Sequence, residues 1–126
     1  MKLLLDTHVF IWATTATSLL SAKVLDLLGD TDNEVMVSAV SAYEIEFKRP
    51  RDGELQRMPS DLNEAARFQN FSWLPMSWRH ARDAGLLPMH HRDPWDRILV
   101  AQALAEGAAL VSIDRQLGVY AAQVVW

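Results

Sequence analysis

Hydrophobic residues fall into short continuous runs along this chain, separated by segments with helical spacing. The runs Lys2–Leu5, Val35–Val37, Ala108–Ser112 and Val124–Trp126 have the length of strands, and Trp73–Met76 is a fifth candidate. Continuous apolar runs are typical of strands buried on both faces, as in a parallel sheet covered by helices. The pattern therefore predicts an α/β fold with a short parallel sheet of about five strands.

Segments with helical spacing fill the intervals between these strands. We expect helices over Thr7–Ala13, Ser18–Leu28, Ala39–Lys48 and Leu62–Phe71, and another from Ser77 to about Leu86. With the helix described next, two helices then follow each of the first three strands. This alternation predicts a sheet sandwiched by helices on both faces.

The helix with the clearest boundaries precedes the fourth strand. Asp93 suits the N-cap and Pro94 the first helical position, and Gly107 suits the C-terminal stop. Asp96 lies three residues after the cap and can reach back to it, as in a capping box. The body of this segment is apolar on nearly all sides, so we expect a buried helix that packs on the sheet.

Composition narrows the class of protein. The 126 residues, half of them hydrophobic, suit one globular domain over 1–126. The absence of cysteine excludes disulfides and thiolate zinc sites and favours the reducing cytoplasm. The net charge of −4 gives no general attraction to nucleic acid. Asp6 interrupts the apolar N-terminus, so we expect no cleaved signal, and no run has the ~20 apolar residues of a membrane span.

Four carboxylates are predicted to lie at one edge of the sheet. Asp6 ends the first strand, and Glu44 lies in the helix that follows the second. Asp96 opens the helix before the fourth strand, and Asp114 follows that strand. In open α/β sheets, functional sites form beyond the carboxyl ends of the strands. Each acid also has a purely structural interpretation, as a helix cap or, for Glu44, as the ion-pair partner of Lys48.

Gathering these acids has an energetic cost. Two unit charges 5 Å apart repel by roughly 3 kcal/mol at an effective dielectric constant of about 20. A cation between them would remove this cost, and oxygen ligands without cysteine favour Mg²⁺ or Mn²⁺ over zinc. Such an ion lowers the pKa of a bound water and holds phosphate oxygens, which predicts a phosphodiester substrate.

Other polar residues flank the same edge. Thr7, Ser41, Ser112 and Arg97 are candidate contacts to the substrate or to the carboxylates. Capping, strand-end solvation and, for Arg97, simple surface exposure are the alternative interpretations. The basic stretch between Lys48 and Arg57 suits either an RNA backbone or a solvated loop.

The histidines allow a different mechanism. Two of His8, His80, His90 and His91 could act as general acid and base without metal, or His90 and His91 could bind zinc with Asp93. Neither spacing matches a known ligand pattern. We therefore expect packing, capping or loop roles for all four.

Four segments together resemble a known family. Leu3–His8, Val37–Ile45, His91–Arg97 and Leu110–Asp114 are similar, in order and spacing, to the PIN-domain ribonucleases. They are most similar to the VapC-like toxins of type II toxin–antitoxin modules. The Asp-Pro-Trp-Asp-Arg sequence within His91–Arg97 is the most distinctive part of the resemblance.

The resemblance implies a PIN-like parallel α/β sandwich and an endoribonuclease that depends on Mg²⁺ or Mn²⁺. It implies that Asp6, Glu44, Asp96 and Asp114 form the metal pocket. It also implies a homodimer and a cognate antitoxin whose tail blocks the active site, with no membrane partner. Apolar helices between Val9 and Leu28 are the candidate dimer surface. Alternatives are a non-catalytic PIN-like module that binds RNA or protein, and a hydrolase that uses the histidines.

Overall fold

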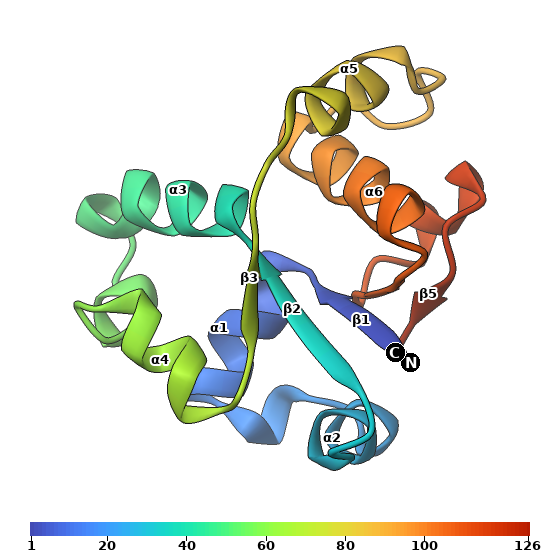
Figure 1. Cartoon of the computed structure of the whole chain (residues 1–126). Helices are drawn as coiled ribbons and strands as arrows, with labels where there is room; N and C mark the ends of the chain where they lie inside the picture. The colour runs from blue at the N-terminus through green and yellow to red at the C-terminus, as the bar shows by residue number, and fades with distance from the viewer.

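The computed structural model describes all 126 residues and contains one five-stranded sheet (Figure 1). The strands are β1 (Lys2–Leu5), β2 (Glu34–Ser38), β3 (Ser72–Leu74), β4 (Ala109–Val111) and β5 (Val124–Val125). They lie in the order β3-β2-β1-β4-β5, and every neighbouring pair is parallel. The predicted α/β fold with about five parallel strands is therefore confirmed.

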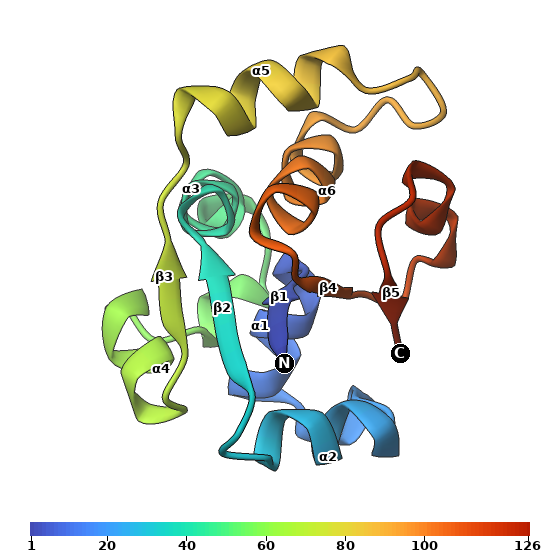
Figure 2. The ribbon, with the colours of Figure 1, turned by 45° about the vertical axis from the view of Figure 1, so that its right-hand side comes forward.

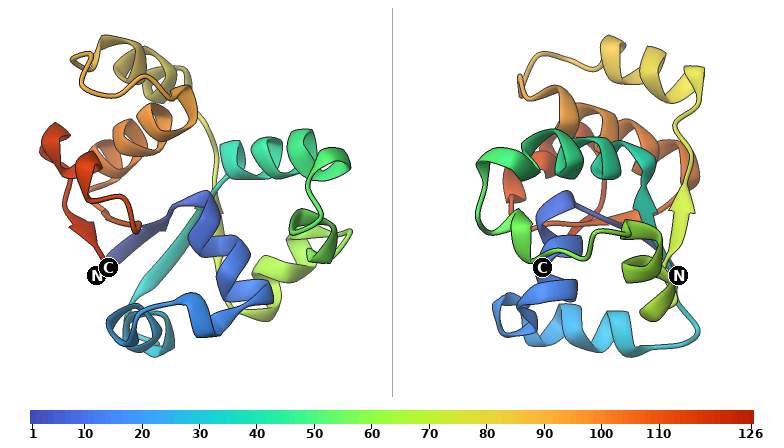
Figure 3. Two further views of the ribbon diagram at one scale, coloured as in Figure 1. Left: turned by 180° about the vertical axis from the view of Figure 1, so that it is seen from behind. Right: turned by 90° about the vertical axis from the view of Figure 1, so that its left-hand side faces the viewer.

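Six α-helices surround the sheet. They are α1 (Thr7–Thr15), α2 (Ala22–Gly29), α3 (Ala39–Lys48), α4 (Leu62–Phe68), α5 (Trp78–Leu86) and α6 (Pro94–Glu106). Short 3-10 helices are η1 (Thr17–Leu19), η2 (Arg49–Arg51), η3 (Leu55–Arg57) and η4 (Arg115–Tyr120). Figures 2 and 3 show α5 beyond α6 at one end of the molecule and α2 at the opposite end. No helix has the length and apolar character needed to cross a bilayer.

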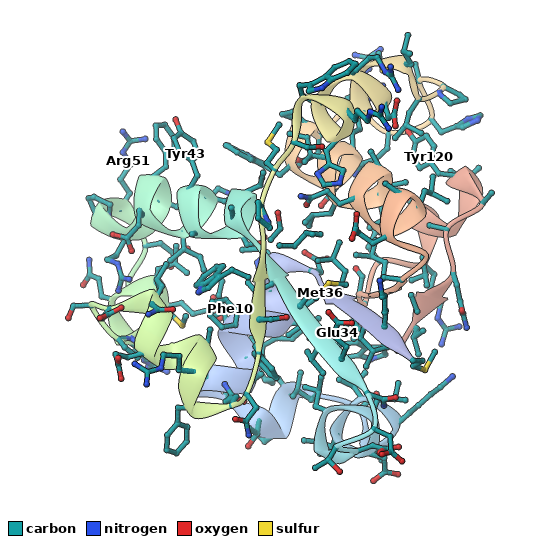
Figure 4. The ribbon with its side chains drawn as sticks, viewed as in Figure 1. Phe10, Glu34, Met36, Tyr43, Arg51 and Tyr120 are labelled. Carbon is teal, nitrogen blue, oxygen red and sulfur yellow. The ribbon has the colours of Figure 1, made fainter.

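Two hydrophobic cores lie on opposite faces of the sheet. Leu3 and Leu5 of β1 join the core with Phe10 and other residues of α1, α2 and α4. Leu4 and Met36 belong to the second core, which α6 and η4 cover. Figure 4 labels Phe10 and Met36, one from each core. Successive strand residues point to opposite faces, so a strand with helices on both sides is apolar without interruption.

The helix predicted over Ser18–Leu28 is divided in the structure. It consists of η1 and then α2, because the Ser21 hydroxyl accepts a hydrogen bond from Val24 N at 3.1 Å and starts a new helix there. Val9 and Phe10 of α1 are fully buried in the core. The core therefore uses this part of the apolar surface suggested for a dimer, whereas Leu19 of η1 and Leu25 of α2 are exposed.

The boundaries of α6 agree with the sequence pattern. Asp93 Oδ1 accepts hydrogen bonds from Trp95 N at 2.9 Å and Asp96 N at 3.3 Å. Gly107 ends the helix in the left-handed region, with φ 62° and ψ 33°. Because α6 runs back along the sheet before β4, its N-terminus returns to the edge where the parallel strands end.

That edge brings distant parts of the chain together. Leu5 pairs in register with Val37 of β2 and with Val111 of β4. The residues that follow these three strand ends therefore lie side by side. They form the framework of the site described next.

Candidate active site

Asp6 follows the central strand β1 and is 9% exposed. It occupies the N-cap position of α1, yet its side chain makes no capping hydrogen bond. Instead, Asp6 Oδ2 accepts a hydrogen bond from Ser112 Oγ at 2.6 Å, and Asp6 N donates to Val111 O at 2.9 Å. The carboxylate is thus fixed to the end of β4, and the capping interpretation of Asp6 does not apply.

Asp96 lies in the first turn of α6, and its carboxylate forms its hydrogen bond with the preceding loop instead of with the N-cap residue. The Asp96 Oδ2 atom lies 2.8 Å from His91 Nε2. The second half of the predicted capping box is therefore absent, and the carboxylate faces the loop before the helix. Asp93 alone supplies the cap.

Asp114 forms a compact cluster with Asp96 and His91. One ligand atom from each of His91, Asp96 and Asp114 lies within 4.8 Å of the others. Asp114 Oδ1 also accepts a hydrogen bond from Gln116 N at 3.0 Å, so this residue caps η4 as its structural interpretation proposed. The cap uses one oxygen, and the carboxylate still belongs to the cluster.

The electrostatics connect the other acids to this cluster. Burial raises the pKa of Asp96 to about 6; the hydrogen bond with His91 opposes this shift, and the charge of Asp6 adds to it. Burial also raises the pKa of Asp6, against the hydrogen bond from Ser112, and the charge of Glu44 raises it further. The charge of Asp6 therefore acts on Asp96, and the charge of Glu44 acts on Asp6, across one edge of the sheet.

Glu44 forms the helical ion pair that the sequence spacing indicated. Lys48 Nζ lies 2.5 Å from Glu44 Oε2. This hydrogen bond raises the pKa of Lys48, and the charges of Asp93 and Asp96 contribute. A cavity of about 60 Å³ opens beside the pair and is also lined by Thr7. Lys48 is 46% exposed, so its ammonium group borders the acidic edge and remains accessible.

The three hydroxyl residues proposed as substrate contacts are buried. Thr7 Oγ1 and Ser41 Oγ are 2.8 Å apart, which joins α1 to α3, and Ser112 bonds Asp6. These hydroxyls therefore fix the site's framework and orient a carboxylate, and of the three residues only Thr7 also lines the cavity beside Glu44.

Arg97 lies in a different environment from the exposed rim position that the sequence suggested. It is 8% exposed, and its guanidinium donates to backbone carbonyl oxygens at 2.8 to 3.1 Å. The accepting residues are Ala84, Leu87, Pro88 and His91. Arg97 thus holds the connection between α5 and α6 against the helix, and both of its terminal nitrogens are already bonded. The structure does not support a phosphate-binding role for it.

The basic stretch after Glu44 is only partly available. Arg49 donates to Glu46 and to the carbonyl oxygens of Leu55 and Met58, so it holds the loop together. The Arg51 guanidinium lies 5.4 Å from the centre of the Phe47 ring at the surface. Any contact of this stretch with RNA would use its exposed members.

The histidines have separate roles. His80 Nδ1 accepts a hydrogen bond from Ser77 N at 3.0 Å and so helps to cap α5. The His90 ring lies against Tyr120, with centroids 5.5 Å apart. Since Asp93 caps α6, the suggested group of His90, His91 and Asp93 does not form. His91 contacts Asp96, a role that sequence reasoning missed because a loop residue follows no periodic pattern, and His8 lines the cavity beside Glu44.

The donor set suits a divalent cation. Asp96 and Asp114 lie close together beside His91, and the charges of Asp6 and Glu44 act at the same edge, so carboxylate oxygens of the kind that Mg²⁺ and Mn²⁺ prefer are present. The raised pKa of Asp96 reflects burial and like charge, both of which a bound cation would offset.

Comparisons of the sequence with known proteins give two matches. Residues 3–123 match the family model of the PIN domain. The protein named ribonuclease VapC22 from Mycobacterium tuberculosis is 27% identical over 125 residues, which cover 90% of this chain and 88% of that protein.

Solved structures share the fold at low sequence identity. A crystal structure of VapBC2 from Rickettsia felis, bound to a promoter DNA fragment, has a TM-score of 0.77 at 17% identity and covers 100% of this chain and 99% of that one. DNA-bound VapBC from Salmonella typhimurium has a TM-score of 0.73 at 15% identity, with 99% and 97% coverage.

Proposed function

The chain belongs to the PIN-domain family, and we propose on this basis that it is a metal-dependent endoribonuclease, the toxin of a type II toxin–antitoxin pair. The observation that supports the proposal is the cluster of Asp96 and Asp114 with His91, together with the charge effects that relate Asp6 to Asp96 and Glu44 to Asp6. The similarity to a relative named a ribonuclease supports it. The substrate bond is the RNA phosphodiester.

In this proposal Asp6, Glu44, Asp96 and Asp114 hold the cation. When bound, Mg²⁺ or Mn²⁺ would stabilise negative charge on the phosphate and lower the pKa of the attacking water. The protein's own groups orient these ligands, since Ser112 fixes Asp6 from β4. The accessible ammonium group of Lys48 can contact a phosphate oxygen at the rim.

Purified protein incubated with structured RNA tests the activity directly. We expect cleavage with Mn²⁺ or Mg²⁺, none with EDTA, and at least a roughly hundredfold loss in Asp96→Asn, because a carboxylate ligand is lost. Asp83→Asn, at a surface acid paired with Arg82, is the matched control and should cleave normally.

Two results would contradict the proposal. Cleavage that persists in EDTA and is lost in His91→Ala would indicate histidine chemistry without metal. RNA binding without cleavage, at any Mn²⁺ concentration, would indicate the non-catalytic binding module.

We also propose an antitoxin partner with a basic tail. The acidic edge would attract Lys and Arg side chains, and a tail bound there would exclude both RNA and metal. A neighbouring gene for a small basic-tailed protein is the expected source. Its purified product should inhibit cleavage, and this inhibition should weaken as the salt concentration rises.

Self-association of the chain as a cytoplasmic homodimer is the third part of the proposal. An apolar groove next to the start of α3 is large, at about 360 Å³, and has no charged residue in its lining. Its lining residues are Ala39, Val40, Tyr43, Met76, Trp95 and Ile98. Exposed apolar patches of this kind mark interaction surfaces. We assign this groove to a second copy of the chain.

A further inference from the structure

His91 contacts the acidic edge although it lies outside the predicted set of acids. It belongs to the loop between α5 and α6, five residues before Asp96. Its Nε2 atom lies 2.8 Å from Asp96 Oδ2, and one of its ring nitrogens lies within 4.8 Å of a carboxylate oxygen of Asp114. The side chain is 23% exposed, so most of the ring is enclosed by the site.

Buried groups hold the backbone of His91 in this position. The His91 carbonyl oxygen accepts hydrogen bonds from Arg97 Nη1 at 3.1 Å and from Tyr120 Oη at 3.4 Å. Tyr120, labelled in Figure 4, comes from η4, and Arg97 comes from α6. Two elements outside the loop, α6 and η4, therefore hold the backbone that carries the imidazole. A chance surface contact would not need this support.

The distance between the His91 ring nitrogen and the Asp96 carboxylate oxygen suits neighbouring ligands of one cation. Ligands about 2.1 Å from an octahedral ion, at right angles to each other, are about 3 Å apart. His91 Nε2 and Asp96 Oδ2 are separated by 2.8 Å. A neutral imidazole would also add a ligand without adding negative charge to an edge that already holds several carboxylates.

We propose that His91 Nε2 is itself a ligand of the divalent cation, beside Asp96 and Asp114, and that this nitrogen makes the site prefer Mn²⁺ to Mg²⁺. The inference rests on the proposed function, because it requires the metal site. Mg²⁺ favours oxygen ligands and retains several waters, whereas imidazole suits transition-metal ions.

Electron paramagnetic resonance of Mn²⁺ added to the purified protein tests this coordination without measuring activity. The signal of unbound Mn²⁺ measures the concentration of free ion, from which the affinity follows. Pulsed measurements detect ¹⁴N coupling from a directly bound imidazole. We expect the wild type to show this coupling and His91→Ala to lose it. Mn²⁺ affinity should fall by at least about tenfold and Mg²⁺ affinity should fall by less.

Two further variants separate coordination from simple positioning. His91→Gln can still donate a hydrogen bond to Asp96 but offers no imidazole nitrogen, so we expect it to lose both the ¹⁴N coupling and the preference for Mn²⁺. His90→Ala, which changes the exposed ring against Tyr120, should keep both.

The possible failures are distinguishable. Mn²⁺ bound by the wild type without ¹⁴N coupling would overturn the role of His91 and leave the carboxylate site intact. If His91→Gln kept the Mn²⁺ affinity of the wild type, the role of His91 would likewise be overturned and the carboxylate site would stand. Absence of Mn²⁺ binding at millimolar concentration would overturn both this inference and the metal-dependent function.

Discussion

Single residues decide how this site is built, and Arg97 shows how a sequence can mislead. Its position next to Asp96 suggested a phosphate contact, but the side chain turns inward and bonds to the connection before its own helix. Sequence spacing placed the four acids at one edge because strand ends meet there. It did not find His91, since that contact depends on how Arg97 folds the loop.

Arg97→Lys should destabilise the protein although it keeps the charge. One ammonium group cannot reach the four carbonyl oxygens that the guanidinium bonds, so buried acceptors would lose their donors. We expect the free energy of unfolding in urea to fall by about 2–4 kcal/mol. Arg82→Lys, on the surface of α5, should change it little. Unchanged stability with weakened RNA binding in Arg97→Lys would instead support a phosphate contact.

The raised pKa of Asp96 predicts a pH dependence in metal-free protein. A folded-state pKa of about 6 lies above the ordinary 3.8, so the native state binds more protons than the unfolded state between these values. The free energy of unfolding should therefore fall as the pH rises from about 4 to 6, and stay lower above.

Asp96→Asn removes this contribution because it carries no charge. In EDTA we expect it to be more stable than the wild type by about 1–3 kcal/mol at pH 8, and to approach the wild type below pH 4. Urea unfolding at both pH values measures the difference, with Asp83→Asn as the control. If Asp96→Asn were less stable than the wild type at pH 8, the charged carboxylate would not destabilise the folded protein.

At the level of elements, the sequence predicted what local chemistry determines. The α6 boundaries follow from Asp93, Pro94 and Gly107, and each strand from its apolar run. The division of Ser18–Leu28 was missed because Ser21 competes as a cap within a continuous apolar pattern. The sheet order depends on contacts between distant segments, which no local pattern contains.

Two glycines should respond in opposite directions to substitution by alanine. Gly107 has φ 62°, and an added Cβ would meet nothing within 4 Å, so only backbone strain opposes it. Gly107→Ala should lose about 1 kcal/mol of stability. Gly85 lies inside α5 with equally open space, and Gly85→Ala should gain about 0.5–1 kcal/mol. Urea unfolding of both variants checks the signs, and a stabilising Gly107→Ala would contradict the left-handed cap.

For the whole molecule, the exposed aromatic side chains of α3 are the clearest sign of a partner. Tyr43 and Phe47 are stacked with centroids 6.0 Å apart and are 59% and 53% exposed. In Figure 4, Tyr43 and Arg51 point away from the body of the molecule. In the N-terminal helices favoured by the sequence, Val9 and Phe10 fill the core, whereas Leu19 and Leu25 are exposed.

Tyr43→Asp should dissociate the proposed homodimer. In a symmetric interface the change places two charges in an apolar environment, which disfavours association. Light scattering after size-exclusion chromatography should show the monomer mass, with unfolding of the monomer little changed. Phe68→Asp alters a side chain on α4 that is 90% exposed and should leave the dimer intact. Dissociation by Phe68→Asp alone would place the interface elsewhere.

The hydrogen bond between Ser112 and Asp6 joins residues 106 positions apart. The central strand β1 is synthesised long before its neighbour β4. A nascent chain therefore cannot assemble the carboxylates until β4 and Asp114 have been made. Under the proposed function, truncated products that lack β4 should not cleave RNA, so the order of synthesis itself would delay any cleavage of the messenger being read.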